Sequence, residues 1–394
     1  MAKKDKSSES GERPDTEVVH LGRKPFEQHG FVNTPVYRGS TVLYPTLDAI
    51  KKRTQPFTYG RRATPTTNAL EEAITHLEGG TATVLTSSGL AAVSTAMLAF
   101  VESGDHILVT DSVYQPARAF ADKLLKRLGV EMTYYDPLIG GDIAKLFRSN
   151  TRLVWVEAPG SQTFEMQDIP AIAAAAHAKN IWVLADNTWA TPIFCKPLAL
   201  GADVSIEAAT KYIVGHADAM LGSVTANGRA AKFIDTAKEA LGTCPGSEET
   251  YLGLRGLRTL AVRLERHQRS GIAVAEWLAG RPEVDRVLHP ALPGDTGHAI
   301  WKRDFTGASG LFTAVLKPIP EKALAAFLDG LKLFGMGYSW GGYESLVIPF
   351  DPTSYRTATR WHGPGPALRF HIGLEAVEDL IDDLTAGFGR MKSA

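Results

Sequence analysis

The stretch Ala208-Ala209-Thr210-Lys211-Tyr212 comes just after the apolar run at residues 202–206. The run predicts a β-strand, so Lys211 lies just past a strand end and outside any run of charges. Burial disfavours the ammonium form of a lysine held in this way, and a neutral amine can form an imine with an aldehyde. A surface lysine after a strand is the more common case, so Lys211 needs support from another part of the chain.

That support comes from Asp186, which ends a second apolar run at residues 181–185. One predicted strand ends in an aspartate, and a later one is followed by a threonine–lysine pair. The combination suits pyridoxal 5'-phosphate, because the aspartate can hold a proton on the pyridine nitrogen while the lysine forms the Schiff base. Lys211 and Asp186 are therefore the first two candidate catalytic residues.

Three segments resemble the Cys/Met-metabolism family of pyridoxal-phosphate enzymes: residues 185–190, residues 209–216 and Tyr59-Gly60-Arg61. The resemblance extends from about Thr34 to the C-terminus, with the motifs in the family's order. It implies an α/β chain of fold type I, with a mostly parallel sheet in the large domain. We expect an N-terminal tail and arm over residues 1–65, the cofactor-binding large domain over 66–256 and a smaller α+β domain over 257–394.

The order of predicted elements agrees with this fold. Alternation of strands and helices predicts a parallel sheet with helices on both faces, and ligands bind such sheets at the carboxyl ends of the strands. A single long helix is expected over 248–278, as a link between the two domains. Further strands are expected at 81–86, 106–110, 131–135, 152–157, 220–226, 284–288, 310–317, 346–349 and 367–371, and further helices at 116–128, 169–178, 321–333 and 376–391.

The resemblance also assigns contacts to the cofactor. Gly89 and Leu90 begin a predicted helix and correspond to the family's phosphate loop, where free backbone N–H groups can bind an anion. Thr210 offers a hydroxyl to the same phosphate. Tyr114 follows a predicted strand, and the resemblance implies that its ring stacks on the cofactor and takes part in catalysis.

The N-terminal arm is expected to serve a neighbouring subunit. Residues 12–65 are rich in turn formers and are unlikely to pack alone. In the resembled family, the residues that match Tyr59 and Arg61 reach across a dimer interface to the other subunit's cofactor phosphate. This implies a homodimer within a homotetramer. Arg62 is a candidate for binding the distal end of the substrate.

Substrate contacts are expected in the last third of the chain. Arg369 lies between apolar residues on a predicted strand, and the resemblance implies that it clamps the substrate α-carboxylate. Ser339 and Trp340 lie in a Tyr-Ser-Trp-Gly-Gly segment of the form carried by bacterial cystathionine β-lyases. That form implies β-elimination of L-cystathionine to L-homocysteine, pyruvate and ammonia in methionine biosynthesis, with Lys211 as the base.

Two residues depart from the family pattern: the first leaves Thr210 as the remaining hydroxyl for the phosphate, and the second sets this chain apart from γ-synthases and γ-lyases. Ala208 stands where a phosphate-binding serine is common, and Ser161 stands where γ-type members carry an asparagine. A γ-lyase or sulfhydrylase of the same family, or a weakly active cofactor-binding regulatory protein, remains possible. Product identity separates the enzymes, and turnover separates them all from the regulatory protein.

Bulk properties agree with a cytoplasmic enzyme of two domains. The chain has 394 residues and a net charge of −1, so no long-range field favours nucleic acid or a membrane surface. No stretch approaches the roughly 18 apolar residues of a membrane span. Two cysteines favour a reducing compartment, and no metal site is expected. Residues 1–11 have no apolar core of a signal peptide and are expected to form a disordered tail.

Overall fold

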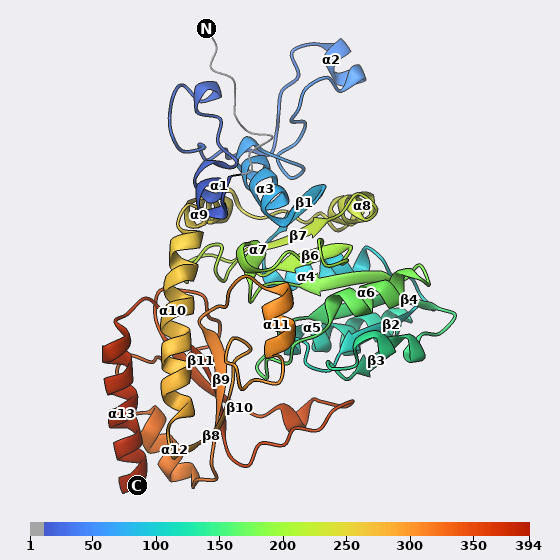
Figure 1. The fold of residues 1–394 in the computed structure, drawn as a ribbon. Helices are drawn as coiled ribbons and strands as arrows, with labels where there is room; N and C mark the ends of the chain where they lie inside the picture. The colour runs from blue at the N-terminus through green and yellow to red at the C-terminus, as the bar shows by residue number, and fades with distance from the viewer. Residues whose placement is uncertain (1–11) are drawn as a thin grey trace.

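The computed structural model describes residues 12–394, so the tail expected over residues 1–11 lies outside the described residues. The described chain is organised around two β-sheets, one of seven strands and one of four (Figure 1). Within residues 12–394, no helix combines the length and the apolar character needed to cross a membrane.

The larger sheet is mostly parallel, as the sequence predicts. Its strand order is β1-β7-β6-β5-β4-β2-β3, and only β7 runs antiparallel to its neighbours among the described strands. The α/β expectation is therefore confirmed. The strands are β1 (Ala82–Thr86), β2 (His106–Thr110), β3 (Glu131–Tyr135), β4 (Thr151–Glu157), β5 (Trp182–Asp186), β6 (Val204–Glu207) and β7 (Gly222–Ala226).

Helices cover both faces of this sheet because successive strand residues point to opposite sides. On β2, Ile107 and Val109 pack into a cluster with residues of α4 and α5, whereas Leu108 packs into the cluster that contains α6. The helices around the sheet are α3 (Pro65–Glu78), α4 (Gly89–Leu98), α5 (Gln115–Phe120), α6 (Ile169–His177), α7 (Thr191–Phe194) and α8 (Ala231–Leu241).

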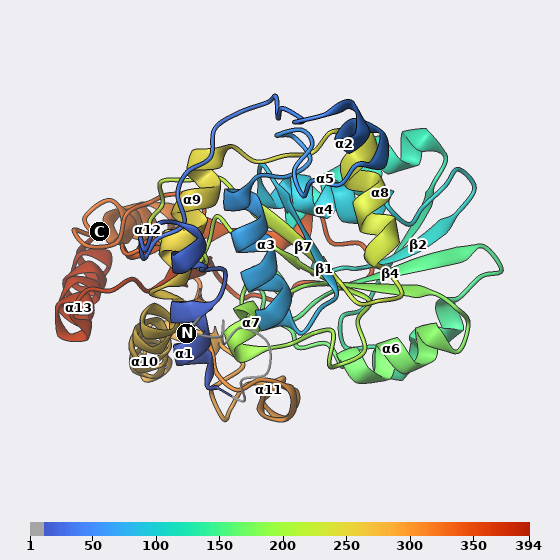
Figure 2. The ribbon, with the colours of Figure 1, turned by 90° about the horizontal axis from the view of Figure 1, so that it is seen from above.

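The smaller sheet is antiparallel and forms the second half of the body. Its order is β10-β11-β9-β8, and its apolar face packs against three helices to make a separate core. Figure 2 shows these helices on one side of the molecule and α6 on the other. The elements are β8 (Val284–Leu288), β9 (Leu311–Leu316), β10 (Leu346–Phe350), β11 (Ala367–His371), α10 (Leu260–Ala279), α12 (Glu321–Leu328) and α13 (Val377–Ser393).

The single helix expected over 248–278 is wrong, because the chain breaks it into α9 (Ser247–Leu257) and α10. At the break, the Arg263 side chain caps the carboxyl end of α9. Arg263 Nη2 donates to the carbonyl oxygen of Gly256 (2.8 Å), and Arg263 Nε donates to Thr259 Oγ1 (3.0 Å). The helix expected over 116–128 also changes after Phe120, into a π-helical and then a 3₁₀ turn.

The N-terminal segment has two parts with different surroundings. α1 (Pro14–His20) packs Val18 into a core formed with α3 and α10. α2 (Leu47–Lys52) instead projects away from the body in Figure 1. Large apolar side chains on and near this projection are exposed, including Leu43 and Leu47 at 84% and 66%. α11 (His298–Asp304) completes the set of helices.

Candidate active site

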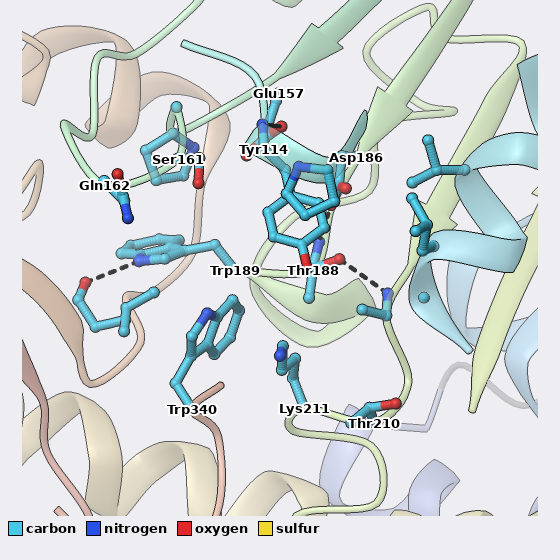
Figure 3. Close-up of a pocket in the computed structure, with 18 of the residues that line it drawn as sticks. Tyr114, Glu157, Ser161, Gln162, Asp186, Thr188, Trp189, Thr210, Lys211 and Trp340 are labelled. Atoms are coloured by element: carbon cyan, nitrogen blue, oxygen red, sulfur yellow. Dashed lines mark hydrogen bonds between the residues drawn. The ribbon is translucent and has the colours of Figure 1, made fainter. Parts of the chain in front are cut away.

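A cavity of about 380 Å³ lies at the carboxyl ends of β4, β5 and β6 (Figure 3). Both sheets contribute to it, since Asp186 ends β5 whereas Arg369 lies on β11. Eight of the sequence-predicted site residues line this cavity: Gly89, Leu90, Tyr114, Asp186, Thr210, Lys211, Trp340 and Arg369.

Lys211 reaches the cavity from a tight turn that follows β6. Its N–H donates to the carbonyl oxygen of Ala208 (2.9 Å), and its own carbonyl accepts from Gly215 (2.8 Å). Lys211 Nζ donates to Ser339 Oγ (2.7 Å). Burial, together with the positive charge of Arg369, lowers the pKa of Lys211 to about 8, although Asp186 opposes the shift. A neutral amine is therefore accessible near physiological pH.

Asp186 presents a carboxylate with few protein partners to the same cavity. Asp186 Oδ1 accepts from the Thr188 N–H (3.0 Å), and no other hydrogen bond to this carboxylate is found within residues 12–394. Burial raises the pKa of Asp186, while Thr188 and the charge of Lys211 act in the opposite direction. The unfilled acceptor capacity suits a protonated ring nitrogen, which would stabilise the ionised carboxylate.

The first turn of α4 forms another wall of the cavity. Its N-cap Ser88 accepts from the Ala91 N–H (3.1 Å), and the N–H groups of Gly89 and Leu90 have no helical acceptor. A Cβ on Gly89 would lie 2.4 Å from the Cβ of Ala208, so only glycine lets α4 approach the lysine turn this closely. The helix start is therefore a backbone cradle for an anion.

Thr210 lines the cavity, but its hydroxyl is already engaged. It donates to the Leu221 carbonyl oxygen (3.0 Å) and accepts from the Leu221 N–H (2.8 Å). The hydroxyl thus ties the lysine turn to the start of β7, and its assignment as a phosphate ligand stays a prediction.

Tyr114 points its ring into the cavity from the N-terminus of α5 (Figure 3). Its N–H donates to Glu157 Oε2 (2.8 Å). Burial raises the pKa of the Tyr114 phenol, and the negative charges of Asp186 and Glu157 add to the effect. The phenol is therefore protonated at neutral pH and can donate a hydrogen bond.

Arg369 supplies an unsatisfied cation. It is 8% exposed, and its Nη2 donates to the Ser339 carbonyl oxygen (2.9 Å). Its buried Nε has no hydrogen-bond partner within residues 12–394, and no carboxylate there pairs with it. Burial lowers the pKa of Arg369 to about 10, so the guanidinium remains charged at neutral pH. A buried unpaired cation beside a cavity fits an anionic group of a ligand.

The segment 338–342 closes over the lysine. The Trp340 ring centroid lies 5.3 Å from Lys211 Nζ and 5.4 Å from the Tyr212 ring centroid. Gly341 has a φ of +87°, and a Cβ there would lie 2.9 Å from the carbonyl carbon of Lys211. Ser339 does not line the 380 Å³ cavity, although its hydroxyl and carbonyl hold Lys211 and Arg369.

Three predicted site residues lie elsewhere in this chain. Tyr59, Arg61 and Arg62 line a separate cavity of about 270 Å³. The Arg61 guanidinium lies 6.0 Å from the Tyr59 ring centroid, and Arg62 Nε lies 3.5 Å from Glu239 Oε1. The chain does not bring these side chains to its own Lys211.

Sequence reasoning missed one buried carboxylate of the cavity, Glu157. It ends β4 directly beside Asp186 in the strand register. Burial raises its pKa well above the ordinary range, with a further contribution from Asp186. The sequence did contain a signal for Glu157, because this acidic residue ends the predicted strand at 152–157, just as Asp186 ends its own strand. Its bond to the Tyr114 N–H shows that it holds the neighbouring loop.

This donor set fits pyridoxal 5'-phosphate. The α4 N-terminus suits the phosphate, the open carboxylate of Asp186 suits the ring nitrogen, and the Lys211 amine suits the aldehyde. The three groups converge on one cavity from α4, from the end of β5 and from the turn after β6.

Comparisons with known proteins agree. A family model described as "Cys/Met metabolism PLP-dependent enzyme" matches residues 15–389. A putative cystathionine β-lyase of Rhizobium johnstonii is 54% identical over 95% of each chain. A cystathionine β-lyase of Escherichia coli is 46% identical over 96% of this chain and 98% of that protein. The crystal structure of cystathionine γ-synthase from Xanthomonas oryzae superposes with a TM-score of 0.90 at 30% identity, covering 98% of this chain and 100% of that one. The chain therefore belongs to the Cys/Met-metabolism family of pyridoxal-phosphate-dependent enzymes.

Proposed function

We propose that this protein is a carbon–sulfur lyase that converts L-cystathionine and water to L-homocysteine, pyruvate and ammonia, a reaction of methionine biosynthesis. The observation that carries the proposal is the convergence of Lys211, Asp186 and Arg369 on one cavity. Relatives named cystathionine β-lyase reach 46% identity and one named putative cystathionine β-lyase reaches 54%, whereas the relative named cystathionine γ-synthase from Mycobacterium bovis is 34% identical, which supports β- over γ-elimination.

When bound, pyridoxal 5'-phosphate supplies an aldehyde for amines and a ring that accepts an electron pair. Asp186 would hold the proton on the ring nitrogen. Gly89 and Leu90 would bind the phosphate through their N–H groups, with Thr210 beside them. We assign Tyr59 and Arg61 to the phosphate of the partner subunit's cofactor, since both lie outside this chain's own cavity.

Lys211 has two tasks in this proposal, to bind the cofactor and to move a proton. With substrate in the cavity, Nζ would act as the base that removes the Cα proton, and a pKa of about 8 suits a base at neutral pH. The homocysteine sulfur leaves from Cβ, and Lys211 and Tyr114 are both candidates for protonating it. The raised pKa of Tyr114 keeps a proton on its phenol for this step.

Arg369 orients the substrate through its α-carboxylate, with Ser339 holding both Arg369 and Lys211. This orientation would decide which Cα bond is aligned for cleavage. Trp340 narrows the cavity beside the amine, and Arg62 of a partner subunit is assigned to the distal end of the substrate.

We further propose a homodimer within a homotetramer, located in the cytoplasm. The projecting N-terminal arm supports association, because its exposed apolar side chains include Phe26, Phe31 and Leu43 at 80%, 70% and 84%. Free Cys195 and Cys244 suit a reducing compartment.

An assay that separates keto acids tests the proposed reaction. β-Elimination of cystathionine releases pyruvate, whereas γ-elimination releases 2-oxobutyrate. The holoenzyme is expected to form mainly pyruvate, together with an equal amount of free thiol. Mainly 2-oxobutyrate would assign the protein to the γ-lyases, and formation of neither keto acid would favour a regulatory role.

A further inference from the structure

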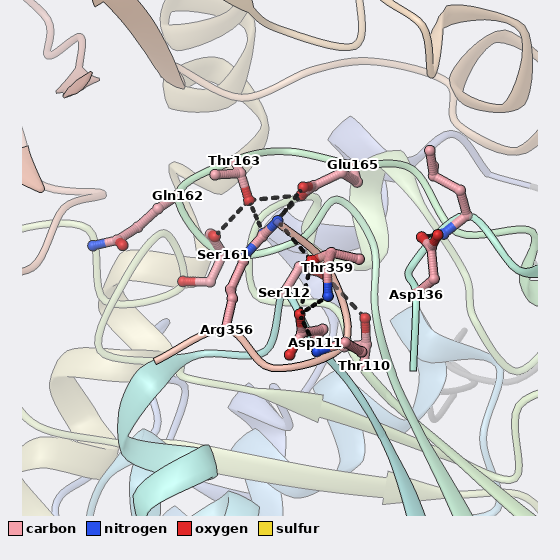
Figure 4. Close-up of polar contacts among 12 residues, drawn as sticks. Thr110, Asp111, Ser112, Asp136, Ser161, Gln162, Thr163, Glu165, Arg356 and Thr359 are labelled. Atoms are coloured by element: carbon pink, nitrogen blue, oxygen red, sulfur yellow. Dashed lines mark hydrogen bonds and ion pairs between the residues drawn. The ribbon is translucent and has the colours of Figure 1, made fainter. Parts of the chain in front are cut away.

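A short segment of the C-terminal half docks on the loops of the large sheet that carry active-site residues (Figure 4). We call residues 355–359 the docking segment; it follows a 3₁₀ turn at Pro352–Ser354 and precedes β11. Its partners are the loop after β2, which leads to Tyr114, and the loop after β4, which contains Ser161.

Asp111 receives the docking segment with both carboxylate oxygens. Oδ1 accepts from the Thr357 N–H (3.0 Å), and Oδ2 accepts from the N–H groups of Ala358 (3.1 Å) and Thr359 (2.8 Å). Thr359 Oγ1 adds a fourth bond, to Oδ2 (2.7 Å). Asp111 is fully buried. Burial alone would raise its pKa, but the bonds from Thr357 and Thr359 outweigh it, so the pKa is lowered and the group stays charged.

Arg118 balances this charge from the side of α5. Its Nη2 forms an ion pair with Asp111 Oδ1, and its guanidinium lies 3.5 Å from the Tyr134 ring centroid. Arg118 lies on α5, and Tyr114 is the residue just before that helix. Asp111 therefore connects the docking segment to both ends of the Tyr114 loop.

The loop after β4 meets the docking segment through a second set of bonds. Arg356 Nη1 donates to Glu165 Oε1 (2.7 Å), and Tyr355 Oη donates to Gln162 Oε1 (2.8 Å). The two loops are also joined to each other, because the Ser161 N–H donates to the Ser112 carbonyl oxygen (2.8 Å). Gln162 and Ser161 line the active-site cavity.

These contacts matter because the cavity is assembled from two halves. Arg369 comes from the small sheet, whereas Lys211, Asp186 and Tyr114 come from the large one. A substrate held by Arg369 reacts only if it also lies correctly against the groups of the large sheet. A displacement of about 1 Å between the halves can reduce turnover by roughly 10²-fold.

We propose that Asp111 is a positioning residue: by holding the docking segment on the Tyr114 loop, it sets the placement of Arg369 relative to Tyr114 and Lys211. Asp111 does not line the active-site cavity, so its proposed effect acts through these residues. The inference rests on the proposed lyase function for its activity readout, and a spectroscopic readout tests it without that function.

The alternative is that Asp111 only stabilises the fold. Asp203 offers a matched control, since it is a buried aspartate at the opposite end of the same sheet. It is 1% exposed and accepts from the Val183 N–H (3.0 Å), His177 Nε2 (3.0 Å) and Asn227 Nδ2 (3.1 Å). Its substitution perturbs a comparable buried network far from the cavity.

The experiment compares Asp111→Asn, Asp203→Asn and the wild-type holoenzyme. An asparagine presents one acceptor and turns its NH₂ group toward other donors, so the docking segment loses part of its anchor. We expect kcat on cystathionine to fall by about 10- to 100-fold in Asp111→Asn. The visible circular dichroism of the bound cofactor should change as well. Asp203→Asn should lower the melting temperature. Its kcat and KM should stay within about twofold of wild type, and the circular dichroism of its bound cofactor should be unchanged.

If Asp111→Asn does not fold, two substitutions of Thr359 still test the proposal. Thr359→Val removes only the hydroxyl that bonds Asp111, and Thr359→Ser retains it. Thr359→Val should lower kcat about threefold, in the same direction as Asp111→Asn, and Thr359→Ser should match wild type. Kinetics and spectra unchanged in Thr359→Val and in any folded Asp111→Asn would overturn the proposal, even with lower melting temperatures. If the wild type forms no pyruvate, the proposed β-lyase function is wrong. The positioning role of Asp111 can still be tested, because the cofactor spectra of the variants do not depend on that reaction.

Discussion

Two aspartates on neighbouring strands of the large sheet show how similar residues acquire different tasks. Asp203 stands at the amino end of β6, where three hydrogen bonds and an ion pair with Arg229 at 3.7 Å fill its carboxylate. Asp186 stands at the carboxyl end of β5, where Thr188 provides its one hydrogen bond within residues 12–394. A buried carboxylate whose acceptors are filled stabilises the fold, and one that is left open beside a cavity is available to a ligand.

The largest expected effect concerns the amine that faces the open carboxylate. Lys211→Ala removes both the group that binds the cofactor and the proposed base, so turnover should fall by at least roughly 10⁴-fold. Borohydride treatment followed by peptide mapping should find cofactor bound to Lys211 in the wild type and to no lysine in the variant. A reducible linkage at another lysine would show that Lys211 is not the residue that binds the cofactor.

Substituting the two aspartates tests the comparison directly. Asp186→Asn should lower kcat/KM by roughly 10²–10⁴-fold with little change in melting temperature, because it removes a charge from the site and few bonds from the fold. Asp203→Asn should cost roughly 1–3 kcal/mol of unfolding free energy, since it leaves buried donors poorly satisfied, with kcat/KM retained. Equal kinetic losses in the two variants would break the distinction between filled and open carboxylates.

Hybrid dimers test whether the open site is completed by a second chain. Arg61→Ala and Lys211→Ala proteins are each expected to be nearly inactive. Refolded together, they should regain activity, because one site of each hybrid then contains wild-type Lys211 and wild-type Arg61. The unmixed variants, refolded separately, are the control. No recovery in verified hybrids, or a monomer in sedimentation, would contradict the proposed assembly.

The ionisation of Lys211 gives the cavity beside Asp186 a pH dependence. Because its pKa is lowered to about 8, the neutral amine increases as pH rises through 8. Cofactor uptake by apoprotein should therefore accelerate about tenfold per unit below pH 8 and level off above it. Arg369→Met removes the positive charge that depresses this pKa, so the midpoint should move upward. A midpoint near the ordinary lysine value in the wild type would show that the cavity does not desolvate the amine.

The smallest expected effect belongs to the indole beside the amine. Trp340→Leu removes the ring 5.3 Å from Lys211 Nζ and should lower kcat/KM for cystathionine by about 3- to 10-fold. The visible absorbance of bound cofactor should remain, because Trp340 lies away from the α4 cradle. Loss of the cofactor in this variant would mean that the indole supports binding rather than substrate placement.

Much of this arrangement could be predicted because it depends on local pattern. The strands at 106–110, 131–135, 284–288 and 367–371 have the bounds that the apolar runs predict. The sequence predicts that Asp186 and Lys211 lie close together, since parallel strands place their carboxyl ends at one edge of the sheet. The break between α9 and α10 could not be predicted, because the apolar pattern continues through it and the contact of Arg263 with the Gly256 carbonyl becomes visible only in the structure.

The sequence by itself determined the family, the α/β architecture and the cofactor, because these follow from motifs and periodicity along the chain. Only the tertiary structure decided which buried carboxylate is open, how far the pKa of Lys211 falls and that Arg369 lacks a partner. It also revealed that Thr359 reaches back to Asp111. Desolvation and hydrogen-bond saturation depend on residues distant in sequence, so they exist only once the two sheets have packed together.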